Sequence, residues 1–152
     1  TPAMRDSAEI TTKDWQHAWE VVAGLLANKG AFLRAFGSLV TEAKSPEFIE
    51  PLDDEVHIEE LLAFRGPTVE LVRNPASRLA YAVQTDSDPV LLFVDGESYE
   101  LDRICLPAVR ALCADALENL FDISELWQTD ESRSLICRLV QSGALWLAEK
   151  ED

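Results

Sequence analysis

The chain has 152 residues, of which 47% are hydrophobic, and its 28 acidic and 13 basic residues give a formal net charge of −15. This length is enough for one sizeable hydrophobic core or two small ones. The apolar runs are far shorter than the ~18–20 residues of a membrane-spanning helix. The start, TPAMRDSAEI, lacks the basic and apolar segments of a signal peptide. We therefore expect a soluble, cytoplasmic protein that does not bind membranes.

The negative charge is concentrated in the C-terminal half. Residues 1–84 hold 8 basic and 13 acidic residues, a net −5, whereas residues 85–152 hold 5 and 15, a net −10. A surface of this sign repels the phosphate backbone of nucleic acids, so we expect no DNA binding. The charge is explained either by solubility alone or by a basic partner, such as a ribosomal protein.

The residues that usually carry catalysis or bind metals are few and scattered. Cys105, Cys113 and Cys137 are odd in number and form no CxxC pair, which predicts buried, reduced thiols. His57 begins an HxE pattern like that of non-haem iron sites, but no histidine follows it, and His17 lies opposite an apolar helix face. The glycines form no phosphate-binding loop. We expect no catalytic, cofactor-binding or metal-binding residue in this chain.

Two amphipathic helices are predicted at the N-terminus. Thr11 or Thr12 can cap the first, and a break at Asn28-Lys29-Gly30 separates it from a second that runs to about Ala43. So short a connection favours an antiparallel helical hairpin. Each helix carries an apolar stripe that little upstream chain is present to cover. We therefore expect a homodimer interface made of Trp15, Trp19, Val22 and Leu26 in the first helix, and Phe32, Phe36, Leu39 and Val40 in the second.

The middle of the chain combines a linker, a short helix and short strands. Residues 45–55, SPEFIEPLDDE, contain two prolines and no regular pattern, which predicts an extended linker. A short helix is expected from Glu55 to Phe64, with Val56, Leu61 and Leu62 inward. The acidic residues of this region form either a solvated face or a cation-binding patch. Strands are predicted for TVELV and LAYAVQ, with the turn RNPAS between them.

The clearest local pattern is VLLFVDGESYEL, residues 90–101. Asp95-Gly96 supplies the two positive-φ positions of a tight turn between two strands, which predicts a β-hairpin. The hairpin would join the two preceding strands in a small antiparallel sheet. We assign Phe93 and Tyr99 to packing, so that only Asp95 and Glu97 at the tip remain candidates for a site.

After Leu101 the pattern changes to helices. Three are predicted, from LPAVRALCADAL, LFDISELWQ and DESRSLICRLVQ, followed by Gly143 and a closing strand at Ala144–Leu147. The residues expected to point inward are Val109, Leu112, Cys113, Leu117, Leu135, Ile136, Leu139 and Val140. A sheet, three helices and a returning strand are the order of a winged helix-turn-helix domain. The fold class is therefore α+β.

Four segments carry a resemblance to a known family when they are taken in order. They are FGSLVTEAKSPE at 36–47, VRNPASRLAY at 72–81, LLFVDGESYEL at 91–101 and SGALWL at 142–147. Together they resemble the C-terminal portion of the bacterial cupin-like JmjC ribosomal oxygenases, the ribosomal protein arginine 3-hydroxylase family. In that family an N-terminal JmjC barrel binds Fe(II) and 2-oxoglutarate, a helical segment forms the dimer, and a winged-helix domain follows.

The resemblance implies a helical dimerisation segment at residues 1–45, a linker with a short helix at 46–66, and a winged-helix domain at 67–152. The iron ligands of the family, an HxD and a later His, have no counterpart in this sequence. The chain would therefore be the non-catalytic, homodimer-forming part of a 2-oxoglutarate/Fe(II) protein hydroxylase that acts on a basic ribosomal protein. The alternative is a free-standing acidic winged-helix adaptor or a transcription-factor-like module.

Overall fold

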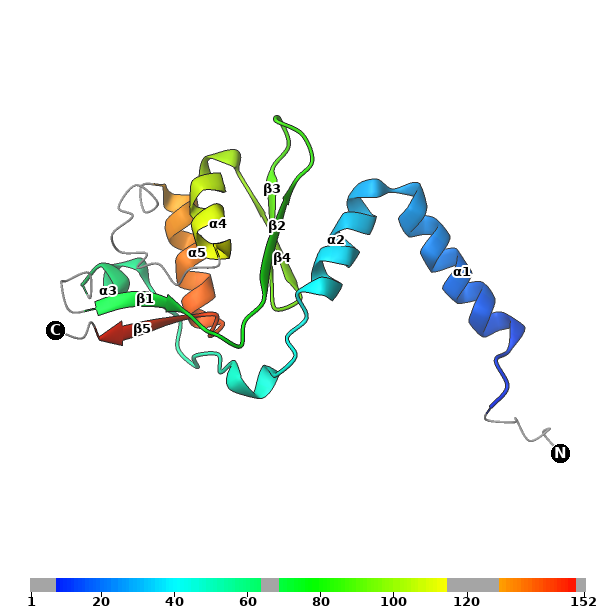
Figure 1. Cartoon of the computed structure of the whole chain (residues 1–152), viewed down its shortest axis with the longest axis horizontal. Coiled ribbons are helices and arrows are strands. Elements are labelled where there is room, and N and C mark those ends of the chain that lie inside the picture. Colours follow the sequence, from blue (N-terminus) through cyan, green and yellow to red (C-terminus); the bar gives the residue numbers. More distant parts are fainter. Residues whose placement is uncertain (1–7, 64–68, 115–128, 150–152) are drawn as a thin grey trace. The chain divides into compact units, whose positions relative to one another are not determined.

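The computed structural model describes residues 8–63, 69–114 and 129–149 of the chain (Figure 1). It divides the chain into two compact units, Thr1–Phe36 and Gly37–Asp152. The first unit is helical, and the second combines helices with two small sheets. None of the described helices is long and apolar enough to cross a membrane.

The first unit contains α1 (Thr12–Ala27) and most of α2 (Lys29–Val40). Thr11 and Asp14 form a capping box, in which each side chain bonds the backbone N–H of the other, so α1 begins where the sequence predicts. Asn28 alone separates the two helices. Its side-chain oxygen accepts a hydrogen bond from the first turn of α2, so one residue both ends α1 and caps α2.

The two helices do not bury their apolar stripes against each other. No residue of α1 is buried, and in α2 only Gly37 is buried. The short connection that the sequence predicts is present, but the closely packed antiparallel hairpin is not. The buried Gly37 belongs to the second unit, where the ring of Phe93 lies against it, so the last turn of α2 packs within that unit.

That C-terminal turn ends at Val40, three residues before the predicted end at Ala43. The hydroxyl of the buried Thr41 donates a hydrogen bond to the carbonyl O of Gly37 (2.8 Å) and accepts one from the N–H of Gly96 (3.2 Å). The second of these bonds joins the helix end to the hairpin turn. Thr41 therefore holds the last turn of α2 and the hairpin turn together within the second unit.

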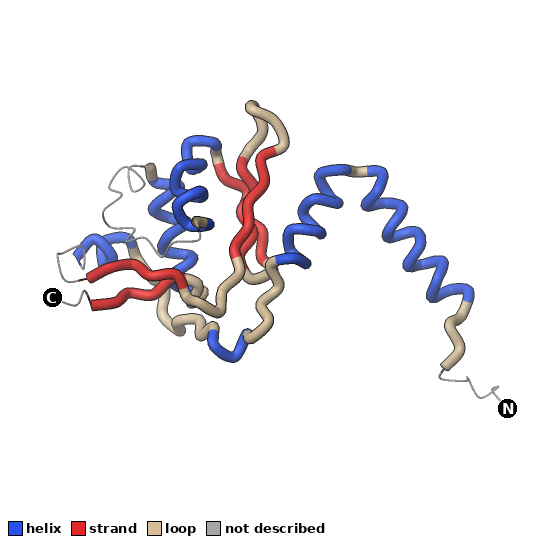
Figure 2. The backbone as a smooth tube through the Cα atoms, viewed as in Figure 1, coloured by secondary structure: helices blue, strands red, loops and turns tan. Residues whose placement is uncertain are grey.

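The strands form two antiparallel sheets, where the sequence suggested one (Figure 2). In the smaller sheet the first and the last of the described strands pair. In the larger sheet the order is β2-β3-β4, and β3 and β4 form the predicted hairpin. The bounds are β1 (Val69–Arg73), β2 (Leu79–Val83), β3 (Val90–Val94), β4 (Glu97–Leu101) and β5 (Leu145–Glu149).

The strands divide into two sheets at Asn74. This residue follows β1 and is 1% exposed. Its backbone N–H donates to the carbonyl O of Ala144 (2.8 Å), and its side-chain amide donates to the carbonyl O of Gly143 (2.9 Å) and of Phe48 (3.0 Å). These bonds hold the end of β1 against the start of β5. The chain then turns away before β2 begins.

The second unit has three described α-helices: α3 (Ile58–Ala63), α4 (Leu106–Cys113) and α5 (Asp130–Gln141). Single turns of 3-10 helix lie at Pro46–Phe48 and Arg103–Cys105. The last helix has the predicted bounds, whereas α3 begins three residues later than predicted. The helix predicted for residues 120–128 lies outside the described residues, as do the side chains of Leu62 and Leu117.

The core lies between the helices and one face of each sheet. Val90, Leu92 and Val94 of β3 belong to it, together with Leu71 of β1 and Leu145 of β5. The helices contribute the residues predicted to point inward, among them Val109, Leu112, Leu135, Ile136, Leu139 and Val140. All five residues of β3 are buried, so both faces of this central strand are covered.

Arg73 links the smaller sheet to the core helices. Its guanidinium donates hydrogen bonds to the carbonyl oxygens of Leu112 and Ala114, each at 2.9 Å. These carbonyls lie at the C-terminus of α4, where the helix leaves its acceptors unpaired and where positive charge is favourable. The arginine at the end of β1 therefore caps α4.

Candidate interaction surfaces

The eight residues predicted for a dimer interface are exposed on α1 and α2. Their exposed fractions run from 38% for Val40 to 67% for Trp19 and Leu39. The rings of Phe32 and Phe36 stack, with centroids 6.2 Å apart, so two of these side chains form a continuous aromatic surface on α2. Large apolar surfaces of this kind mark sites of interaction with a protein or a membrane.

The chemistry of metal sites is not found among the described residues. His17 and His57 are both exposed, on α1 and just before α3. In the described part of the chain, no three His, Cys, Asp or Glu residues are grouped so that they could hold a metal ion. The carboxylates of the linker and of α3 therefore do not form a cation site in the described part of the chain. Together with His17 and His57, they do not fit a binding site for Fe(II).

The three cysteines are free thiols. Burial raises the pKa of Cys113 to about 11, although the nearby Arg73 acts in the opposite direction. Burial is also the largest cause of the raised pKa of Cys105 and of Cys137, and the charge of neighbouring glutamates adds to it. Thiolates are the reactive form of cysteine, so none of these residues is poised as a nucleophile.

The hairpin tip is built for turn geometry. Asp95 and Gly96 have φ values of 51° and 87°, as a tight turn of this type requires. The carboxylate of Asp95 accepts hydrogen bonds from the hydroxyl of Ser77 (2.7 Å) and the N–H of Arg78 (2.8 Å). These bonds occupy both carboxylate oxygens of Asp95 with neighbouring backbone and side-chain donors. Asp95 is therefore structural, and Glu97 is left as the exposed acidic residue of the tip.

By its place just before the closing strand, α5 is the helix that we expect to correspond to the recognition helix of DNA-binding winged helices. The guanidinium carbon of its Arg138 lies 4.5 Å from the ring centroid of Tyr99, which is a cation–π contact. Burial of Tyr99 raises its phenol pKa, and Arg138 opposes that effect. The arginine is thus engaged with the β4 strand of its own domain.

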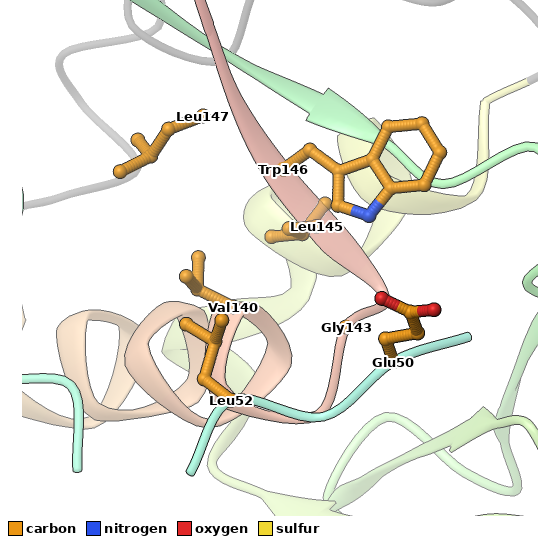
Figure 3. Close-up of a pocket in the computed structure, with 7 residues that line it drawn as sticks. All are labelled: Glu50, Leu52, Val140, Gly143, Leu145, Trp146 and Leu147. Atoms are coloured by element: carbon orange, nitrogen blue, oxygen red, sulfur yellow. The ribbon is translucent and has the colours of Figure 1, made fainter. Parts of the chain in front are cut away.

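A groove that the sequence did not predict lies between the linker, α5 and β5 (Figure 3). Its volume is about 380 Å³, near the lower end of the ~300–1,000 Å³ range of ligand pockets. The lining residues are Glu50, Leu52, Val140, Gly143, Leu145, Trp146 and Leu147. Leu52, Trp146 and Leu147 are 50%, 45% and 40% exposed, so the apolar wall of the groove is open to solvent.

Gln141 at the end of α5 positions the linker that forms one wall of this groove. Its side-chain oxygen accepts a hydrogen bond from the N–H of Val56 (2.8 Å), and its side-chain amide donates to the carbonyl O of Leu52. The N–H of Leu52 donates in turn to the backbone O of Gln141 (2.8 Å). Asp53 and Glu55, farther along the linker, line part of a second hollow of about 440 Å³.

The comparisons with known proteins agree with this architecture. The family model described as the ROXA-like winged helix matches residues 24–146, which is most of the chain. The chain belongs to the ROXA-like winged-helix family. The sequence resemblance to JmjC ribosomal oxygenases and the predicted α+β fold class are thereby confirmed. A comparison with curated proteins finds no match.

Solved structures of the Escherichia coli ribosomal oxygenase YcfD are similar to this ROXA-like chain. One has a TM-score of 0.64 at 17% identity, with 97% of this chain and 38% of that chain covered. Another, described as E. coli ycfD, has a TM-score of 0.63 at 18% identity, with 97% and 37% covered. A third, with the same values as the first, holds cobalt and 2-oxoglutarate. The chain thus spans less than half the length of these proteins, and at this identity the likeness shows the fold.

Proposed function

We propose that this chain is the dimer-forming, non-catalytic winged-helix region of a 2-oxoglutarate/Fe(II)-dependent ribosomal oxygenase in the cytoplasm. The observation that carries the proposal is the family match, which assigns most of the chain to the ROXA-like winged helix. The solved relatives are ribosomal oxygenases, and one of them binds cobalt and 2-oxoglutarate. In a parent protein of this kind, Fe(II) and 2-oxoglutarate would be bound by a catalytic barrel.

The dimer is supported by the stripes on α1 and α2. Their eight apolar residues are exposed over two successive helices, and burial of such a surface is favourable by about 25 cal/mol per Å² of apolar area. A second copy of the same helices would cover both stripes, because a two-fold contact pairs each patch with itself. A four-helix arrangement results.

The winged-helix unit would contribute an acidic surface to the parent enzyme. Ribosomal proteins that bind RNA are basic, and residues 85–152 carry a net charge of −10. Complementary charge accelerates the encounter of two proteins more than it strengthens the complex. A basic ribosomal protein is therefore the substrate that we propose for the parent.

The dimer is tested by light scattering of the chain and its Phe36→Asp variant at tens of micromolar. We expect the wild-type chain to be a dimer and the variant to shift toward monomer, because a carboxylate cannot be buried unpaired in an apolar interface. His17→Asp is the matched control: it adds the same charge to α1, on the face opposite Trp15 and Trp19. A monomeric wild-type chain, or equal dissociation by both variants, would contradict the dimer.

The catalytic part of the proposal is tested with Fe(II), 2-oxoglutarate and purified protein. We expect no succinate release from this chain, and we expect in-frame codons for an HxD and a later His upstream of Thr1 in its gene. Succinate release by the chain that is lost in His57→Ala would contradict the non-catalytic role. A gene without an upstream barrel would favour the free-standing acidic adaptor.

A further inference from the structure

The groove beside β5 lies along the edge of the strand. Its lining includes the three consecutive residues Leu145, Trp146 and Leu147. Successive side chains of a strand point to opposite faces, so a hollow over one face would be lined by alternate residues. The groove therefore runs along an edge of β5. Figure 3 shows Leu145 near Val140 of α5 and Leu52 of the linker, with Trp146 and Leu147 on opposite sides of the strand.

This edge is the one that no described strand occupies. The smaller sheet has the order β1-β5, and within the described residues β5 pairs with β1 only. The groove lining contains no residue of β1. An edge strand presents unpaired N–H and C=O groups that can pair with an added extended segment. A segment that pairs with the free edge of β5 would therefore also lie along the apolar groove.

The negative charge of the linker beside the groove indicates which kind of peptide segment could bind there. Glu50 and Leu52 of the linker form one wall of the groove. The linker Pro46–Glu55 holds five exposed carboxylates and no basic residue: Glu47, Glu50, Asp53, Asp54 and Glu55. One of them, Glu50, lines the groove itself. Lys or Arg side chains of a bound segment would meet the opposite charge of Glu50 and of the linker that carries it. Acidic segments would be repelled.

We propose that the edge of β5 and its groove bind an extended, basic peptide segment of another protein, by addition of a strand. Large apolar side chains of the segment fill the space between Leu52, Trp146 and Leu147, and its Lys and Arg side chains face the linker carboxylates. This proposal goes beyond the dimer and the parent oxygenase, because the groove lies wholly in the winged-helix unit. It names a binding site for a basic protein that is formed by residues of this chain alone.

The test uses the full 152-residue chain and short fluorescein-labelled peptides, followed by fluorescence polarisation. We expect a peptide of alternating Lys and Leu to bind, and peptides with Glu in place of Lys, or Ser in place of Leu, to bind at least about tenfold more weakly. Two further peptides carry N-methyl groups on the amides of one edge or of the other. Strand addition predicts that one of the two loses binding and the other keeps it.

Variants of the chain locate the binding. We expect Leu52→Ser and Leu147→Ser to weaken binding of the Lys-Leu peptide about tenfold, and Glu50→Gln to weaken it less and to reduce its dependence on salt. Ile104→Ser is the matched control, since Ile104 is 63% exposed outside the groove. Thermal unfolding of each variant shows that it is folded.

Several outcomes would overturn the proposal. They are absent binding, equal binding of the Glu-Leu peptide, and equal loss of affinity in Ile104→Ser. A change of oligomeric state in folded Leu147→Ser would show instead that a second copy fills the groove. Each of these results leaves the dimer test with Phe36→Asp unaffected, so failure of the groove and failure of the proposed function are distinguishable.

Discussion

The ring of Phe93 occupies the space that a side chain at Gly37 would need. A Cβ placed on Gly37 would overlap the Cζ, Cε1 and Cε2 atoms of that ring, and Phe93 is itself 2% exposed. The last turn of α2, which belongs to the second unit, therefore approaches β3 as closely as a glycine allows. The contact covers the face of β3 opposite the main core, to which Val90, Leu92 and Val94 belong.

The first prediction follows from this contact. Gly37→Ala should destabilise the folded chain by about 1–3 kcal/mol, because the buried ring must shift into an already packed space. Differential scanning calorimetry should show a lower Tm. Phe93→Leu in the same chain should recover part of the loss, since it removes the overlapping ring atoms.

The control is Gly24→Ala in the middle of α1. A Cβ at this position meets nothing within 4 Å, and alanine favours a helix by ~1 kcal/mol over glycine. This variant should be at least as stable as the wild type. A Gly37→Ala variant as stable as Gly24→Ala would show that Gly37 does not pack against Phe93 in solution.

The second prediction concerns Asn74, which joins the linker, β1 and the start of β5. Asn74→Ala removes the donors to the carbonyl oxygens of Gly143 and Phe48 and the acceptor of the Ala76 N–H. An unsatisfied buried polar group costs about 1–3 kcal/mol. Urea unfolding should show a loss at least that large, whereas Gln84→Ala, at an exposed position, should leave stability unchanged. A neutral Asn74→Ala would contradict the buried network.

The local features of the fold could be predicted from the sequence, because short-range chemistry determines them. Asp95-Gly96 specifies the turn of the hairpin regardless of what the hairpin packs against. The spacing of apolar residues from Asp130 to Gln141 is enough to predict the bounds of α5. Pairing between distant segments could not be predicted in this way. Asn74 divides the sheet by bonding Gly143, 69 positions away, and no local pattern contains that contact.

The candidate surfaces were predictable to different degrees. The stripes on α1 and α2 are periodic, and their residues are exposed on those helices; their role as a dimer interface stays a prediction. The groove beside β5 depends on the linker at Glu50–Leu52 lying next to Gln141. The sequence contains one sign of the groove, which is Trp146-Leu147. Apolar and polar residues alternate in a strand with one buried face, so two adjacent large apolar residues depart from the expected pattern.

The third prediction concerns the thiol of Cys113. With a pKa of about 11, only about one thiol in a thousand is ionised at pH 8, and the thiolate is the reactive form. Its reaction with Ellman's reagent should be slow in the folded chain and should accelerate about tenfold per pH unit up to about pH 11. All three cysteines should react quickly in urea. Fast labelling of Cys113 in the folded state at pH 8, judged against Cys113→Ser, would contradict its burial.

The same raised pKa links stability to pH. The folded chain binds the thiol proton more tightly than the unfolded chain, for which the ordinary value is 9.0. The favourable contribution is therefore complete below pH 9 and is lost as the pH rises through about 11. Urea midpoints measured between pH 8 and pH 11 should fall less in Cys113→Ser than in the wild type. Equal slopes would show that the thiol does not contribute.

The last prediction is that the winged helix does not bind DNA. Helix α5 carries Arg133 and Arg138 together with Asp130 and Glu131, and Arg138 lies over the ring of Tyr99. At ~150 mM salt, charges are screened only beyond about 8 Å, so carboxylates close to the helix would still repel phosphates. Duplex DNA titrated at this salt concentration should show no binding at micromolar concentrations. Binding that is abolished by Arg133→Ala and Arg138→Ala would favour a transcription-factor-like module. Such binding would require these two arginines to outweigh the net charge of −10 over residues 85–152.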